Sequence, residues 1–169
     1  MNNSLLSKDD LKKIGFKSIG ENLKISKNIT IVGPENISIG SNTRIDDYTI
    51  ISAAEGNLSI GSEVHVGGQS YLGCAGGITI KNKINIAQGV KMYSKINDYL
   101  NFDGTNKIIL NPIEIQDYAI IGAGTVIIGE SIIFEGSVVG SLSFVKNNLE
   151  PWSVYAGNPI KFIKKRIKK

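Results

Sequence analysis

The chain has 169 residues and a mass of 18.2 kDa, which is enough for one domain with a buried core and too little to expect two. Hydrophobic content of 41% and charged content of 20% exclude a disordered chain. The net charge of +4 arises at one end: the last nine residues hold six of the 19 lysines and arginines, so the rest carries 13 basic against 15 acidic side chains.

Neither a signal peptide nor a membrane span is indicated. The N-terminus has no basic start followed by an apolar stretch, and the longest apolar region, 118–140, is broken by Glu130, Glu135 and several glycines. We therefore expect a cytoplasmic protein that does not associate with membranes.

Residues 7–15 predict a short helix within a capping segment that covers residues 1–18. Ser7 is the expected N-cap with Asp10 three places later, Leu11 and Ile14 share one face, and Gly15 ends the helix. We expect this helix to cover an end of the fold that would otherwise expose unpaired strands.

A six-residue period runs through most of the chain. Aliphatic residues return every six positions in five sets. In the last set, which begins at Ile115, a small residue also stands four places after each of the first five aliphatic positions. The aliphatic positions are Ile19, Ile25 and Ile31; Ile39, Ile45 and Ile51; Ile60, Val66 and Leu72; Ile80, Ile86 and Met92; and Ile115, Ile121, Ile127, Ile133, Val139 and Val145. The small residues are Ala119, Thr125, Ser131, Ser137 and Ser143.

This period fits neither an α-helix nor a plain strand, but it fits a short strand and a corner that repeat three times per coil. We expect a triangular prism over residues 19–155, with about 18 residues per coil and an apolar column inside. The extra residues in "SAAEGN" and "CAGGIT" are expected to bulge at corners, and residues 98–112 to form one long loop.

Residues 156–169 are expected to form a basic C-terminal helix after Pro151 and Pro159. Such a tail suits a phosphorylated small molecule, nucleic acid or anionic lipid. Because no nucleic-acid motif accompanies it, the small phosphate ranks first, and we expect no nucleic-acid partner.

Several segments resemble the hexapeptide-repeat acyltransferases. The repeats "IGAGTV" and "VGSLSF" match the family pattern, and "WSVYAGNPIKFIKKR" is similar to its C-terminal signature. The segments "KDDLKKIGFKSIGENLKIS" and "KMYSKINDY" resemble a branch of sugar acetyltransferases related to galactoside and maltose acetyltransferases. The resemblance implies a left-handed parallel β-helix and a homotrimer with active sites in the clefts between subunits.

The resemblance also implies acetyl-CoA as the acyl donor, lying along the β-helix. Family positions whose backbone holds the cofactor match Ala123 and Ser141, and the basic positions that meet its phosphates match Lys146, Lys161, Lys164 and Arg166. The basic tail thereby gains a candidate partner.

His65 is the single histidine of the chain. Since side chains alternate along a strand, His65 points outward if Val64 and Val66 point into the prism. On the enzymatic interpretation it is the general base that takes a proton from an acceptor hydroxyl as the oxygen attacks the thioester. Asn85 is its equivalent one coil later, about 5 Å away, and is expected to orient the ring or the acceptor.

The start of the long loop is predicted to contact the acceptor through Ser94, Asn97, Asp98 and Tyr99. Many family members carry their catalytic histidine at the position that matches Asn97, and asparagine cannot act as a base. Either His65 supplies the base from another wall of the cleft, or catalysis needs no side-chain base.

The predicted activity is O-acetylation of a saccharide or glycoside. The alternatives are N-acetylation of an aminosugar nucleotide and a structural β-helix without catalysis. A zinc enzyme of the γ carbonic anhydrase type needs three histidines, which one per chain cannot supply, so no metal is expected. Cys74, the single cysteine, is expected to be a small buried or turn residue.

Overall fold

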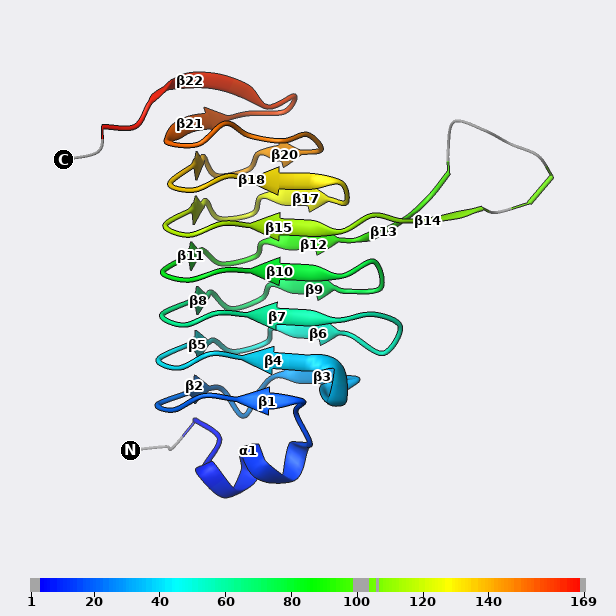
Figure 1. Ribbon diagram of the computed structural model, residues 1–169, viewed down its shortest axis with the longest axis vertical. Coiled ribbons are helices and arrows are strands. Elements are labelled where there is room, and N and C mark those ends of the chain that lie inside the picture. Colours follow the sequence, from blue (N-terminus) through cyan, green and yellow to red (C-terminus); the bar gives the residue numbers. More distant parts are fainter. Residues whose placement is uncertain (1–3, 99–103, 106, 168–169) are drawn as a thin grey trace.

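A computed structural model describes residues 4–98, 104–105 and 107–167. The chain forms a parallel β-helix whose coils stack along one axis, with helix α1 across one end and strand β22 at the other (Figure 1). The prism predicted from the six-residue period is confirmed. The structure describes no helix long and apolar enough to span a membrane.

The prism has three faces, each a sheet in which successive coils pair in parallel. Face 1 consists of β1 (Ser18–Ile19), β4 (Ile37–Ile39), β7 (Leu58–Ile60), β10 (Ile78–Ile80), β15 (Ile113–Ile115) and β18 (Ser131–Ile133). Face 2 consists of β2 (Lys24–Ile25), β5 (Arg44–Ile45), β8 (His65–Val66), β11 (Asn85–Ile86), β16 (Ile120–Ile121), β19 (Val138–Val139), β21 (Ser153–Ala156) and β22 (Lys161–Lys165). Face 3 consists of β3 (Thr30–Val32), β6 (Ile50–Ser52), β9 (Tyr71–Gly73), β12 (Lys91–Tyr93), β17 (Val126–Ile128) and β20 (Phe144–Val145).

Three corners join the faces. The first corner leads from face 1 to face 2, the second from face 2 to face 3, and the third from face 3 to face 1 of the next coil. In a triangular prism each corner lies opposite one face. The third corner is therefore on the far side of the molecule from face 2.

The periodic aliphatic residues stack in register inside the prism. Ile80 pairs with Ile60 on one side and Ile115 on the other, and all three are buried. The small residues between them are buried too, and their hydroxyls satisfy backbone carbonyls: Ser137 Oγ donates to Glu150 O at 2.8 Å, and Thr125 Oγ1 donates to Gly140 O at 3.2 Å. A small side chain is needed here because the chain turns tightly against the column.

Helix α1 spans Lys8–Ile14 and has the predicted ends. Ser7 and Asp10 form a reciprocal capping box, and Gly15 ends the helix in the left-handed conformation. Leu11 is buried in the same hydrophobic core as the coils. The helix therefore covers the open end of the column, as predicted. A short 3₁₀ turn at Pro34–Asn36 precedes β4.

The predicted long loop at 98–112 is partly a hairpin. Strand β13 (Lys95–Asn97) pairs antiparallel with β14 (Ile108–Leu110) and leaves the prism at the third corner (Figure 1). We call residues 95–110 the arm. Residues 108–110 are not loop as predicted, because an Ile-Ile-Leu run can pair with the strand that opens the arm.

The predicted C-terminal helix is wrong. Residues 161–165 form β22, which runs antiparallel to β21 and ends face 2. The ring of Phe162 packs edge-on against Tyr155 at 5.7 Å between centroids. Pairing with the otherwise open last coil satisfies backbone groups and buries aromatic surface, which outweighs the helical spacing of the isoleucines in this segment.

Candidate functional site

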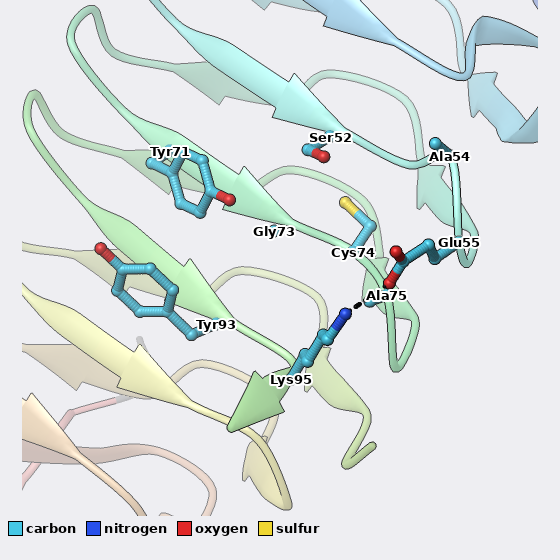
Figure 2. A pocket seen from close by; sticks show the side chains of 9 residues that line it. All are labelled: Ser52, Ala54, Glu55, Tyr71, Gly73, Cys74, Ala75, Tyr93 and Lys95. Carbon is cyan, nitrogen blue, oxygen red and sulfur yellow. Dashed lines mark hydrogen bonds and ion pairs between the residues drawn. The ribbon is translucent and has the colours of Figure 1, made fainter. Parts of the chain in front are cut away.

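A hollow of about 260 Å³ lies where face 3 meets the third corner, beside the base of the arm (Figure 2). Three successive coils and β13 supply its walls. We call it the tyrosine hollow; its lining residues are Ser52, Ala54, Glu55, Tyr71, Gly73, Cys74, Ala75, Tyr93 and Lys95. None of these residues was predicted to form a site, although the bulging segments "SAAEGN" and "CAGGIT" mark the position of the hollow.

The extra residues form the hollow because glycines let the bulged corners stack closely. A Cβ added to Gly56 would lie 2.1 Å from Cys74 O, and one added to Gly76 would lie 2.1 Å from Ser94 O. No side chain fits at these distances. The corners thus widen outward, while the inner column stays in register.

Two tyrosine rings and one ion pair define the chemistry of the tyrosine hollow. Tyr71 and Tyr93 stand on neighbouring coils with ring centroids 5.2 Å apart and planes inclined by 37°. Lys95 Nζ donates to Glu55 Oε2 at 2.6 Å (Figure 2). Aromatic faces suit a planar base or the apolar face of a sugar, and the charged pair offers a donor and an acceptor for polar groups.

Cys74 is fully buried, which is one of the two predicted positions. Burial raises the pKa of its thiol to about 12. The thiol is therefore neutral near pH 7 and is not an activated nucleophile.

Ser94 was predicted to contact the acceptor, but the structure gives it another position. Its side chain is fully buried; Oγ donates to Gly73 O at 2.7 Å and accepts from Gly76 N at 2.9 Å. Ser94 holds the corner around Gly73 and Gly76 against the start of the arm and does not face the open hollow.

Asn97 and Asp98 lie two and three residues beyond Lys95 along the arm, and neither lines the tyrosine hollow. The separation from Lys95 to Asn97 is about 7 Å along an extended strand. Asn97 is exposed, and the Asp98 backbone N–H donates to Lys107 O at 2.8 Å. The predicted acceptor residue Tyr99 lies outside the described residues.

His65 points outward from face 2, as predicted, between the buried Val64 and Val66. Its ring lies 3.0 Å from Asn85 Oδ1 through Nδ1 and 2.8 Å from Asp46 Oδ2 through Nε2. The expected relation between His65 and Asn85 is thus present.

This geometry engages both ring nitrogens. The Asp46 carboxylate can only accept, so Nε2–H donates to it; Nδ1 either donates to the Asn85 oxygen or, after an amide rotation, accepts from its nitrogen. To act as a base, His65 would first have to lose one of these partners. Because face 2 is opposite the third corner, His65 and the arm of the same chain are not in one site.

The residues predicted to hold the cofactor lie at all three corners. Ala123 and Ser141 occupy stacked turns of the second corner, where Leu142 N donates to Ala123 O at 2.8 Å. Lys161 reaches the same end of face 2, since it pairs with Ala156. Lys164 pairs with Val154 toward the other end of β21, and Lys146 follows β20 toward the third corner.

Arg166 lies at the first corner, away from Ala123 and Ser141. Its Nη1 donates to Tyr118 O at 3.0 Å and Gly136 O at 2.9 Å, and its guanidinium lies 5.7 Å from the Trp152 ring. Arg166 therefore ties the C-terminal strand to two turns below it. Across residues 4–98, 104–105 and 107–167, no group of three histidine, cysteine or acidic side chains is arranged to hold a metal ion.

Comparison with known proteins identifies the class of protein. No protein-family model matches the chain. It is 37% identical over 172 residues to the dTDP-4-amino-4,6-dideoxy-D-glucose acyltransferase of Escherichia coli, with 97% of this chain and 90% of that one covered. The structure of AntD, an N-acyltransferase from Bacillus cereus, in complex with dTDP and 3-hydroxybutyryl-CoA superposes with a TM-score of 0.90 at 36% identity, covering 98% and 91% of the two chains.

A hexapeptide-repeat acetyltransferase from Vibrio cholerae shares the fold at 20% identity, with a TM-score of 0.67 and 99% and 85% of the chains covered. This chain is an acyltransferase and belongs to the hexapeptide-repeat, left-handed β-helix family. The E. coli enzyme is named as an aminosugar acyltransferase and AntD as an N-acyltransferase. The predicted galactoside or maltose branch is thus not supported, and the alternative of N-acylation is favoured over O-acetylation.

Proposed function

We propose that this protein transfers an acyl group from an acyl-CoA to the amino group of a dTDP-linked 4-amino-4,6-dideoxy sugar. The observation that carries the proposal is the similarity to the E. coli enzyme, which extends over 90% of that enzyme and 97% of this chain. AntD has also been crystallised with dTDP-4-amino-4,6-dideoxyglucose and coenzyme A, as a point mutant that is 35% identical to this chain.

The tyrosine hollow is the proposed acceptor site. Its rings offer stacking surfaces for a pyrimidine base or the apolar face of a deoxy sugar, and Glu55 and Lys95 can bind polar groups. Asp98 at the base of the arm adds a carboxylate that can hold the sugar ammonium group and accept its proton.

The proposed reaction forms an amide. The sugar ammonium first loses one proton, and the neutral nitrogen then attacks the thioester carbonyl. The nitrogen gives up a second proton as the C–S bond breaks, and the sulfur takes up a proton, so that CoA leaves as a thiol. An amine loses its proton near neutral pH with little help, whereas a hydroxyl needs a base in the transition state. This difference is consistent with Asn97 at the position where many family members have a catalytic histidine. The proposed reaction also requires no proton transfer to His65.

The small residues at the second corner remain the proposed place for the donor. Ala123 and Ser141 occupy stacked turns at the end of face 2 where Lys161 pairs with Ala156. The predicted homotrimer, with donor and acceptor meeting between subunits, is part of this proposal.

The test measures thiol release from acetyl-CoA and from 3-hydroxybutyryl-CoA with dTDP-4-amino-4,6-dideoxyglucose as acceptor. The matched control is dTDP-6-deoxyglucose, which carries a hydroxyl at the same carbon. We expect turnover with the amine and at least tenfold less with the hydroxyl. Equal turnover with both would restore the O-acetyltransferase prediction, and no turnover with either would reject the proposed acceptor class.

A further inference from the structure

A second hollow, of about 510 Å³, lies at the edge of face 2 with the first corner, over the first two coils at the end away from the basic tail. We call it the cationic hollow; its lining residues are Asn22, Leu23, Lys24, Asn42 and Arg44. Among the residues that line it there are two cations and no carboxylate. Lys24 and Arg44 are direct neighbours in the register of β2 and β5, so their backbones lie about 5 Å apart.

A neighbouring hollow of about 340 Å³ has the opposite character. Arg44 borders it too, but Asp46 and Asp47 also line it, together with uncharged residues. An anion is therefore attracted to the cationic hollow and repelled from its neighbour. Arg44 lines both hollows.

Arg44 is held in place by a chain of hydrogen bonds along face 2. Its Nε donates to Asp46 Oδ1 at 2.5 Å, and the other carboxylate oxygen of Asp46 accepts from His65 Nε2 at 2.8 Å. His65 Nδ1 lies 3.0 Å from Asn85 Oδ1. Each group in this relay, Arg44–Asp46–His65–Asn85, is fixed by the next one.

The carboxylate in the middle stays ionised. Partial burial alone would raise the pKa of Asp46, but the hydrogen bonds from His65 and then Arg44 outweigh burial and hold it below its usual value. The groups that face His65 are Asp46 and Asn85 across the face, with Arg44 in register on the adjacent strand. With Nε committed to Asp46, the two terminal nitrogens of the guanidinium are the donors that remain for an anion.

We propose that Arg44 and Lys24 bind a diphosphate group in the cationic hollow, and that His65 is a positioning residue that acts through Asp46 to orient the guanidinium. A planar guanidinium fits phosphate oxygens with two parallel hydrogen bonds, and a neighbouring ammonium adds charge. The inference rests on the proposed function only in its choice of ligands, since a nucleotide sugar and CoA both contain a diphosphate.

The experiment measures the affinity of the full-length protein for dTDP and, separately, for CoA by calorimetry. Replacing Arg44 by Met removes the charge and the donors, and we expect roughly 10- to 100-fold weaker binding of the ligand whose diphosphate occupies the hollow. The ligand that responds identifies the source. Lys81→Met, an exposed cation of the first corner, is the matched control and should change neither affinity.

The relay is tested by His65→Ala alone and combined with Arg44→Met. We expect His65→Ala to weaken the same ligand by roughly 2- to 10-fold, and to have no further effect once Arg44 is replaced by Met. A purely structural role would lower the melting temperature without this selective loss. Arg44→Lys keeps the charge but lacks the two parallel N–H donors, so its affinity for the ligand should lie between those of wild type and Arg44→Met. This conservative variant separates the loss of the donors from a folding defect.

Three results would overturn the inference. Unchanged affinities for both ligands in a folded Arg44→Met variant would remove the diphosphate site. A His65→Ala effect that adds fully to that of Arg44→Met would remove the relay. A His65→Ala variant with unchanged affinities but a large loss of kcat would return His65 to the role of base. If the wild type binds dTDP and CoA but does not acylate the aminosugar, the proposed acceptor fails while the diphosphate site stands.

Discussion

Lys95 Nζ lies 2.6 Å from Glu55 Oε2, although 40 residues and two coils separate them in the chain. Both side chains are partly exposed, Lys95 at 38% and Glu55 at 66%. An exposed ion pair contributes at most about 1 kcal/mol to folding. Its position across the mouth of the tyrosine hollow therefore points to ligand binding and not to stability.

Replacing Glu55 by Gln tests this interpretation. We expect a melting temperature within a few degrees of wild type and a KM for the aminosugar nucleotide raised roughly 3- to 30-fold, because a charged hydrogen-bond partner is lost. Steady-state kinetics with the nucleotide sugar as the varied substrate measure it. Glu35→Gln, in the short turn before β4, is the control. A lower melting temperature with an unchanged KM would show that the pair is structural.

Asp98 should matter for turnover more than for binding. Asp98→Asn keeps the shape but loses the ability to accept a proton. Because an amine needs little help to lose its proton, we expect kcat to fall by less than the roughly 10²-fold that a required general base is worth, while CoA affinity is unchanged. Asp9→Asn, on the first turn of α1, should leave kcat at the wild-type value. An Asp98→Asn enzyme with full kcat would show that the amine needs no carboxylate from the arm.

The stacking of the bulged corners gives a stability prediction. A Cβ on residue 76 would lie 2.1 Å from Ser94 O, so Gly76→Ala must displace backbone and should destabilise the fold by about 2–4 kcal/mol. Gly104→Ala, within the arm, meets no atom within 4 Å and carries only the strain of its positive φ of 90°, about 1 kcal/mol. Urea unfolding of the two variants compares them directly. Equal stabilities would mean that the corner can relax.

The inner column and α1 could be predicted from the sequence because both are encoded locally. The six-residue recurrence of residues such as Ile80 and Ile86 predicts the triangular coil, and Ser7, Asp10 and Gly15 supply both ends of the helix. The tyrosine hollow could not be predicted in the same way. Tyr71 and Tyr93 are ordinary outward positions until the coil spacing brings them together, and that contact depends on a register that no short motif specifies.

The errors have the same origin. The run that ends in Lys165 has helical spacing, but its partner is the last coil, which sequence spacing does not reveal. Ser94 reads as a loop residue, yet the bulge at Gly76 encloses it. The partners of His65 are 19 and 20 residues away, so the sequence predicted its direction but not that both nitrogens are engaged.

Cys74 should be unreactive while the protein is folded. At pH 8 we expect no detectable reaction with a thiol reagent over minutes and full reaction in denaturant, because the thiol is buried and its pKa is about 12.

The raised pKa of the Cys74 thiol in the folded protein also makes the stability of the fold depend on pH. The unfolded thiol ionises from about pH 9, so its contribution to stability is complete below that pH and declines as pH rises toward 12. Between about pH 8 and 10 the free energy of unfolding should therefore decrease less for Cys74→Ala than for wild type. An equal decrease in both proteins would assign the alkaline loss of stability to other groups.

The positions of the two hollows predict complementation between copies of the chain. The tyrosine hollow is at the third corner and the cationic hollow is at the edge of face 2 with the first corner, on different sides of the prism, so one small ligand can use both only by bridging two subunits. Co-expressed Asp98→Asn and Arg44→Met chains should form mixed trimers, and in each mixed trimer one of the three interfaces combines two intact halves. At low nucleotide-sugar concentration these trimers should exceed the mean activity of the two variants assembled alone. The control pairs Asp98→Asn with a chain that carries both substitutions, so that no interface has an intact Asp98, and it should show no gain. Mixed trimers without gain, or light scattering that returns a monomer, would confine each site to a single chain.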